Sequence, residues 1–107
     1  PNKNDVVTGL SNPEGILLNG NDLYIAESGA NRISKIDITK KNPTVTGVVS
    51  GVFGPFALAV SGNDLYIAEY GANKISKIDI TVKTPTKTDV VTGLSQPIGL
   101  AVHAKKL

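Results

Sequence analysis

The segment PEGILLNGNDLYIAESGANRISKIDITKKNPTVTGVVSGVFG occupies residues 13–54, and PFALAVSGNDLYIAEYGANKISKIDITVKTPTKTDVVTGLSQ follows it directly over residues 55–96. The two segments are identical at 26 of 42 positions. Self-similarity at a fixed period of this length is the mark of a repeat protein, in which each repeat folds as one supersecondary unit. Residues 1–12 match the end of a repeat, and residues 97–107 begin a third repeat before the sequence diverges.

Each repeat contains four runs rich in Val, Ile, Leu, Tyr and Thr, separated by turn residues, which predicts four short β-strands. We expect these strands at 15–18, 23–27, 32–38 and 44–50, and again at 57–60, 65–69, 74–80 and 86–92. The connections NGND, SGND, SGAN and YGAN contain Gly and Asn, which tolerate the positive φ of tight hairpins. Pro43 and Pro85 indicate a looser connection before each fourth strand.

Four antiparallel strands in every 42 residues are typical of one blade of a β-propeller. Leucine-rich repeats are shorter, at roughly 20–29 residues, and helical repeats show a period of about 3.6. The sequence therefore predicts an all-β fold with two propeller blades, 13–54 and 55–96. In a blade, the loop before the first strand and the turn between the second and third strands share one face of the disc.

A blade buries its two apolar faces only against other blades, because an exposed apolar sheet is unfavourable in water. We therefore expect self-assembly into a homo-oligomer, with three chains of two blades forming a closed six-bladed ring. Residues 1–12 resemble the fourth strand of a blade and residues 98–102 the first strand. Either the leading strand pairs with a blade of a neighbouring chain, or part of one terminus lies outside the ring. Tyr24 and Tyr66 are expected in the core between blades.

The composition limits which classes of protein remain open. Hydrophobic residues make up 40% of the chain and charged residues 19%, as in a globular protein, and the net charge is only +2. The lysines and arginines form no basic stripe, so we expect no nucleic-acid partner, and no apolar run is long enough to predict a membrane span. Without cysteine there is no disulfide and no thiolate zinc site, and redox chemistry assigns no compartment, so an extracellular or periplasmic location stays open.

The segments PEGILLNGNDLYIAESGANRISKID and PFALAVSGNDLYIAEYGANKISKID resemble the NHL repeat and its relatives, in which LYIAD or LYVAD and NRI-x-KID recur in each blade. The resemblance extends over nearly the whole chain. It implies a six-bladed propeller that serves most often as a binding platform. Some relatives, the gluconolactonase and strictosidine-synthase-like groups, use the central channel for metal-assisted or acid–base chemistry. The chain is shorter than whole family members, which implies oligomerisation or excision from a longer protein.

The two repeats differ most on the face that carries the loop before the first strand. There Glu14 is replaced by Phe56, and Ser28 is replaced by Tyr70, whereas the turns on the opposite face are nearly identical. A ligand surface would therefore include Glu14, Ser28, Phe53, Phe56 and Tyr70. The alternative is sequence drift in solvated loops after duplication.

Two patterns of acidic residues suggest chemistry at first sight. Three copies of Glu14 around the axis of a ring could bind a hard cation, but the equivalent positions hold Phe56 and Ile98, so no metal site is predicted. Other carboxylates recur in both repeats: Asp22, Asp64, Glu27 and Glu69. Residues needed in every blade more often cap turns or pair locally, here with Arg32 or Lys74, so no catalytic residue is predicted.

The favoured function is a non-enzymatic binding or scaffold module that self-assembles into a closed ring without a cofactor. Its ligand would be a protein, a peptide or a glycan, and the absence of Trp makes a glycan the weaker choice. One alternative is a propeller hydrolase or lactonase with an acidic or metal site at the channel mouth. Another is an engineered or excised propeller fragment whose main property is assembly.

Overall fold

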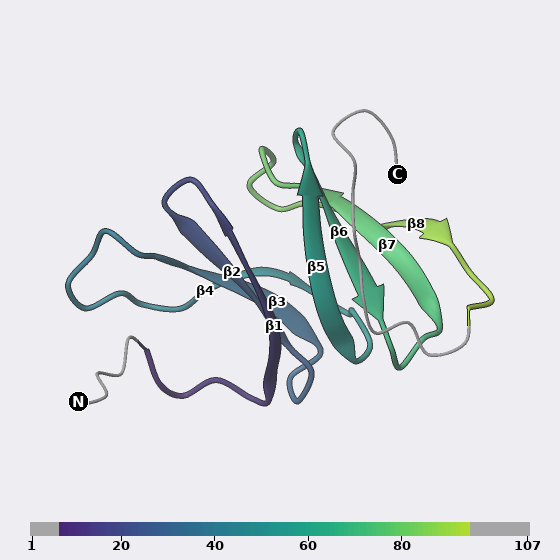
Figure 1. Cartoon of the computed structure of the whole chain (residues 1–107), viewed down its shortest axis with the longest axis horizontal. Helices are drawn as coiled ribbons and strands as arrows, with labels where there is room; N and C mark the ends of the chain where they lie inside the picture. Colours follow the sequence, from purple (N-terminus) through teal and green to yellow (C-terminus); the bar gives the residue numbers. More distant parts are fainter. Residues whose placement is uncertain (1–6, 95–107) are drawn as a thin grey trace.

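The computed structural model describes residues 7–94, which form two four-stranded antiparallel sheets (Figure 1). The first sheet contains β1 (Pro13–Asn19), β2 (Asp22–Glu27), β3 (Arg32–Asp37) and β4 (Thr46–Ser50), in that order. The second contains β5 (Pro55–Ser61), β6 (Asp64–Glu69), β7 (Lys74–Asp79) and β8 (Thr88–Val91), also in that order. The all-β prediction and the pattern of four strands in each repeat are confirmed, and each sheet has the form of a propeller blade.

The third strands are one residue shorter than predicted, ending at Asp37 and Asp79 rather than at 38 and 80. The carboxylate of Asp37 accepts hydrogen bonds from Thr39 N at 2.9 Å and Thr39 Oγ1 at 2.6 Å, and Asp79 makes the same pair with Thr81. This side-chain turn competes with the sheet ladder and ends the strand. The hydrogen bonds from Thr39 hold the pKa of Asp37 below its usual value of 3.8. The fourth strands begin at Thr46 and Thr88, two residues later than expected.

Positive φ occurs at some of the predicted turn residues and not at others. Gly20, between β1 and β2, has φ 64°, and Asn31, between β2 and β3, has φ 51°. Gly29 is a glycine for another reason: a Cβ at this position would lie 3.1 Å from Ser11, in the segment before β1. Gly71 is the equivalent residue of the second repeat, and a Cβ there would lie 3.0 Å from the carbonyl oxygen of Phe53. These glycines allow the loops of one blade end to pack closely.

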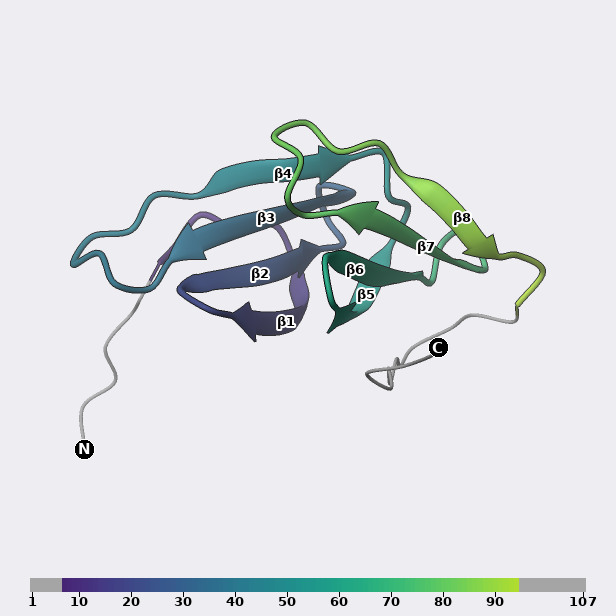
Figure 2. The same ribbon diagram turned by 90° about the horizontal axis from the view of Figure 1, so that it is seen from above.

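The two sheets pack face to face, with their first strands adjacent and their fourth strands on the far side. β1 contacts β5, and both lie on the same side of the molecule in Figure 2, opposite β4 and β8. In a propeller the first strands line the channel and the fourth strands form the rim. The pair of sheets therefore has the radial arrangement of two neighbouring blades.

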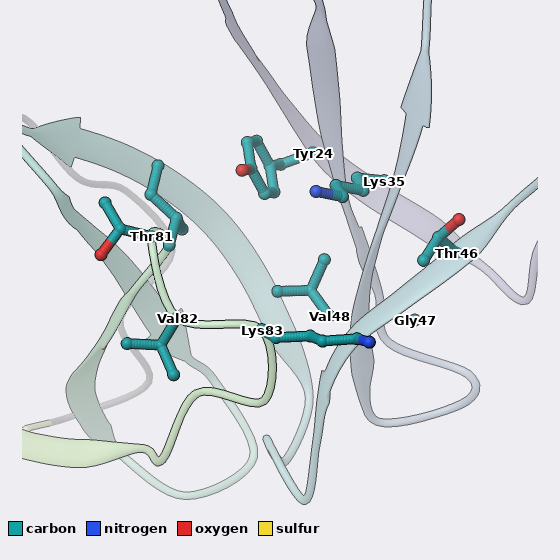
Figure 3. A pocket seen from close by; sticks show the side chains of 9 residues that line it. Tyr24, Lys35, Thr46, Gly47, Val48, Thr81, Val82 and Lys83 are labelled. Atoms are coloured by element: carbon teal, nitrogen blue, oxygen red, sulfur yellow. The ribbon is translucent and has the colours of Figure 1, made fainter.

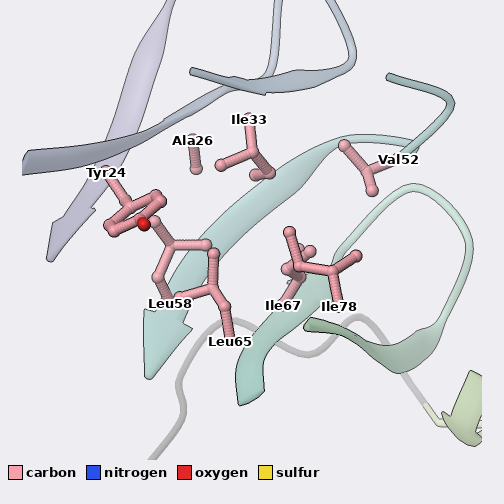
Figure 4. Packing of buried hydrophobic residues seen from close by; sticks show 8 residues of the cluster. All are labelled: Tyr24, Ala26, Ile33, Val52, Leu58, Leu65, Ile67 and Ile78. Atoms are coloured by element: carbon pink, nitrogen blue, oxygen red, sulfur yellow. The ribbon is translucent and has the colours of Figure 1, made fainter. Parts of the chain in front are cut away.

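The hydrophobic core lies between the two sheets and joins opposite faces of the two repeats (Figure 4). The cross-strand pairs Tyr24↔Lys35 and Ala26↔Ile33 share one face of the first sheet, because directly opposed residues point the same way. The second sheet contributes residues from its other face: Leu58, Leu65, Ile67 and Ile78. Val52, in the segment between the sheets, is fully buried at the edge of this cluster.

The outer face of each blade carries exposed apolar residues. Ile16 is 65% exposed and Leu18 is 55% exposed, whereas Leu58, the equivalent of Ile16, is 9% exposed at the interface between the blades. We call Ile16 and Leu18 the blade-1 outer face; Ile25 and Ile36, on the same side of this sheet, are buried.

The side of the second sheet that faces away from the first carries Tyr66, Ile75 and Val91, and we call these residues the blade-2 outer face. Tyr24, the equivalent of Tyr66, is buried between the blades, as predicted, whereas Tyr66 is half-buried.

The strands predicted at the two ends of the chain fall largely outside the described residues. Of the leading segment 1–12, residues 7–12 are described and form no strand, and residues 97–107 are not described. Within residues 7–94 there is no helix long and apolar enough to cross a membrane.

Candidate functional site

The residues predicted to form a ligand surface lie on loops and strand starts at one end of the two blades. The amide of Ser28 donates to the carbonyl oxygen of Asn12 at 3.1 Å, and the amide of Tyr70 donates to that of Gly54 at 2.9 Å. In each blade, therefore, the turn after the second strand is hydrogen-bonded to the segment before the first strand. These backbone bonds bring the predicted residues of one blade onto the same end of that blade.

Equivalent positions of the two blades carry a polar pair and an aromatic pair. In the first blade, Ser28 Oγ donates to Glu14 Oε2 at 3.3 Å. In the second blade, the rings of Phe56 and Tyr70 have centroids 6.1 Å apart and an interplanar angle of 34°. Tilted aromatic pairs at this separation attract one another. The structure thus brings Glu14 to Ser28 and Phe56 to Tyr70.

The ends of the two blades are in direct contact. A Cβ at Gly15 would lie 2.4 Å from the carbonyl oxygen of Phe56, so the backbones of β1 and β5 meet at the start of these strands. The side-chain oxygen of Asn31 accepts a hydrogen bond from Gly54 N at 3.0 Å, which links the turn of the first blade to the loop of the second. The polar pair and the aromatic pair therefore belong to one continuous surface.

Phe53 is the fifth predicted residue and is paired with a lysine that sequence reasoning missed. Its side chain is 52% exposed, and Lys87 Nζ lies 5.6 Å from the centre of its ring. A cation at this distance is attracted by the electrons of the ring. Lys87 also donates to the carbonyl oxygen of Gly51 at 2.9 Å.

Glu27 is a fully buried carboxylate at the base of this surface in the first blade. It accepts hydrogen bonds from Ser11 N at 3.0 Å, Ser34 Oγ at 2.5 Å and Arg32 Nε at 2.9 Å. Burial raises the pKa of Glu27, but the bonds from Arg32, Ser34 and Ser11 outweigh burial and hold the pKa below 4.5. Glu27 is therefore an ionised structural group that holds the loop before β1 against β2 and β3.

Glu69 has the same position in the second blade but a different cation. It accepts hydrogen bonds from Phe53 N at 2.9 Å, Ser76 Oγ at 2.5 Å and Lys87 Nζ at 3.1 Å. Lys74, which the sequence suggested as its partner, instead forms an ion pair with Asp89 at 3.1 Å.

The predicted local pairing is thus confirmed for Glu27 with Arg32. Lys74 interacts with Glu69 only through a Coulombic attraction, which raises the pKa of Lys74 less than its hydrogen bond to Asp89 does. The first repeat has Val45 where the second has Lys87, and Gly47 where the second has Asp89. These two differences between the repeats were the sequence signal that could have revealed the pairs Lys87–Glu69 and Lys74–Asp89.

The other recurring carboxylates also have local partners. Asp22 lies 3.6 Å from Lys35 Nζ, and Asp64 lies 3.7 Å from Lys77 Nζ, both as half-exposed ion pairs across neighbouring strands. Among residues 7–94, His, Cys, Asp and Glu form no group of three or more that could hold a metal ion. We call Glu14, Ser28, Phe53, Phe56 and Tyr70 the loop surface. It presents the carboxylate of Glu14 beside the hydroxyl of Ser28, and the exposed aromatic rings of Phe53 and Tyr70, with the ammonium group of Lys87 next to Phe53.

Comparison with known proteins identifies the fold. No protein-family model matches the chain, and no curated protein sequence matches it. Among solved structures, the chain is similar to selenomethionine-substituted virginiamycin B lyase from Staphylococcus aureus, with a TM-score of 0.67 and 21% sequence identity. The match covers 88% of this chain and 32% of that protein, a seven-bladed β-propeller. The chain thus spans about a third of the length of its structural neighbour, and the two sheets are propeller blades.

Proposed function

We propose that the chain is a propeller binding module that associates with copies of itself through its outer blade faces. The observation that carries this proposal is the packing between the two blades. The face of the first blade that carries Tyr24 and Ile33 packs on the face of the second that carries Leu58 and Ile67. Because the repeats are homologous, the blade-2 outer face is equivalent to the first of these surfaces and the blade-1 outer face to the second.

The energetics favour association of these faces. Burying an apolar side chain of the size of Ile16 or Leu18 stabilises by about 1.5–3 kcal/mol relative to leaving it exposed. Head-to-tail contacts between identical chains close into a ring when the rotation per chain allows it. Two blades per chain give rings with an even number of blades, so a trimer with about six blades is the expected form.

Substitutions on the blade-1 outer face test the association. The double change Ile16→Glu and Leu18→Glu places two carboxylates on a face that must become buried, so sedimentation should show a shift to the monomer. The matched control is Tyr70→Ser, which removes an exposed aromatic side chain from the loop surface and installs the residue of the equivalent position 28. Unchanged association in the Glu variant, with the fold intact by circular dichroism, would refute the proposed interface.

The loop surface is proposed as the ligand-binding part of the module. Two of its aromatic side chains, Phe53 and Tyr70, are exposed without being part of the interface between the blades. Exposed aromatic residues next to a charged group are common anchors for protein and peptide ligands. Within residues 7–94 the carboxylate of Glu14 has one hydrogen-bond partner, the hydroxyl of Ser28, and this setting suits hydrogen bonding to a ligand better than acid–base catalysis.

A peptide and glycan array tests the binding proposal. Phe53→Ser and Tyr70→Ser, each of which installs a residue found at the equivalent position of another repeat, should weaken a binder about tenfold or more. Association of the chains should stay unchanged in both variants. An array without any binder, or a binder insensitive to both changes, would contradict the proposed surface while leaving the assembly intact.

A further inference from the structure

A cavity of about 300 Å³ lies between the first blade and the connection from β7 to β8 (Figure 3). This volume is at the lower end of the range of small-molecule sites, which is about 300–1,000 Å³. The lining of the cavity contains none of Glu14, Ser28, Phe53, Phe56 and Tyr70. The first blade contributes one wall: Tyr24, Lys35, Thr46, Gly47 and Val48. The second blade contributes the opposite wall: Ile80, Thr81, Val82 and Lys83.

The wall of the first blade is a row of three polar side chains across its strands. Tyr24 of β2 is directly opposite Lys35 of β3, which is directly opposite Thr46 of β4. Because opposed residues in a ladder point to the same side, all three side chains face the second blade. Figure 3 shows Lys35 extending from this wall toward Tyr24.

The opposite wall is a turn fixed by hydrogen bonds within the turn and to the neighbouring turn between β5 and β6. The amide of Ile80 donates to the carbonyl oxygen of Asn63 at 2.9 Å, and Asp79 holds the amide and hydroxyl of Thr81. The cavity is therefore preformed, and Val82, which is 48% exposed, leaves it open to solvent at the turn. Preformed sites avoid the free-energy cost of ordering a loop on binding.

Among residues 7–94, two ammonium groups and no carboxylate line the cavity. Lys35 Nζ forms an ion pair with Oδ2 of Asp22 at 3.6 Å, and Asp22 does not line the cavity. Lys83 forms no ion pair with any residue of the described range 7–94. Burial, with a smaller effect from Asp22, raises the pKa of Tyr24, so its hydroxyl stays protonated at neutral pH. The cavity therefore offers positive charge and hydroxyl donors.

We infer that this cavity binds a small organic anion. Its anionic oxygens would be held by Lys35, Lys83 and the hydroxyl groups of Tyr24 and Thr46. A short apolar tail would pack against the aliphatic lining, which is Val48, Ile80 and Val82. The inference does not depend on ring assembly, because both walls belong to one chain.

The second wall is particular to the second repeat. The equivalent of Val82 in the first repeat is Lys40, whereas Lys83 is matched by Lys41. An apolar residue in this turn is thus a departure from the first repeat that creates a place for an apolar group. An anion without an apolar part would bind equally well if position 82 were a lysine, as in the first repeat.

The test uses the whole chain labelled with ¹⁵N and follows amide shifts while butyrate, butylammonium or inorganic phosphate is added. Butyrate should shift the amides of Gly47, Thr81 and Lys83, and butylammonium should leave them unchanged. Equal shifts and equal affinity with phosphate would refute the role of the apolar tail. No shift at the cavity with butyrate would refute the site.

Two matched pairs of variants connect the binding to the cavity. Lys83→Gln should weaken butyrate about tenfold because it removes a charge-assisted hydrogen bond, while Lys41→Gln in the other turn should have no effect. Thr46→Asp should abolish binding by placing a carboxylate beside Lys35, whereas Thr46→Asn, which has the shape of the Asp variant without its charge, should bind more tightly than Thr46→Asp. Equal affinity in Thr46→Asp and Thr46→Asn, in chains that keep the wild-type spectrum elsewhere, would overturn the inference.

Discussion

Lys87 Nζ lies 3.1 Å from Oε1 of Glu69, a glutamate with no exposed side-chain surface. The lysine comes from the segment before β8 and the glutamate from the end of β6, so this pair connects the outer strand of the second blade to its centre. In the first blade the same buried carboxylate is paired with Arg32, only five residues away. The equivalent buried carboxylates of the two repeats are thus paired with cations from different parts of the blade.

Loss of the Lys87 ammonium should destabilise the chain strongly. In Lys87→Met, Glu69 keeps its hydrogen bonds to Phe53 and Ser76 but stays buried without a hydrogen-bonded cation. Removing one partner of a buried ion pair typically costs about 3 kcal/mol or more in the free energy of unfolding. Urea unfolding at one fixed protein concentration measures this loss, since association makes stability depend on concentration.

The control for this measurement is Lys77→Met. Lys77 pairs with Asp64 at 3.7 Å, with both side chains more than a third exposed, and such pairs contribute about 0–1 kcal/mol. Equal losses in Lys87→Met and Lys77→Met would show that burial of Glu69 does not govern the energetics of this site.

The ionised state of Glu27 predicts a dependence of stability on pH. The folded chain holds the pKa of Glu27 below its usual value of 4.5, so the ionised Glu27 contributes stability that is fully present above pH 4.5. That contribution is lost as the pH falls from 4.5 through the folded pKa. The free energy of unfolding of Glu27→Gln should therefore lie below that of the wild type at neutral pH, and the gap should narrow under acid. A gap that is constant or widens on acidification would contradict the assignment.

The contact between β1 and β5 predicts a large effect of one methyl group. In Gly15→Ala the new Cβ would lie 2.4 Å from the backbone oxygen of Phe56, so the blades must separate locally. Overpacking of this kind typically costs about 1–3 kcal/mol in the free energy of unfolding. The control is Gly47→Ala, because a Cβ at Gly47 meets nothing within 4 Å. A Gly15→Ala chain as stable as the Gly47→Ala chain would show that the blades are not packed in this way.

The repeat made the fold predictable, because the strand runs, the turn residues and the period all indicate the same architecture. Gly20 and Asn31 could be assigned to turns since their backbone conformation is a local property. The need for glycine at Gly29 and Gly71 could not be assigned correctly, because it arises from contact with a segment some 18 residues away in sequence.

The candidate site was predictable only in part. Comparison of the repeats found Glu14, Ser28, Phe56 and Tyr70, because a side-chain exchange at matched positions is visible in sequence. Lys87 was missed because its contact with Glu69 spans 18 residues and depends on how the segment before β8 folds over the blade. The cavity beside Lys35 was missed because it forms only when two blades pack.

The molar mass of the chain in solution is the most direct test of self-association through the outer blade faces. Light scattering of the chromatographic peak at micromolar concentration should give about three times the 11.1 kDa of one chain. A single compact species of 11.1 kDa, stably folded at that concentration, would contradict the account.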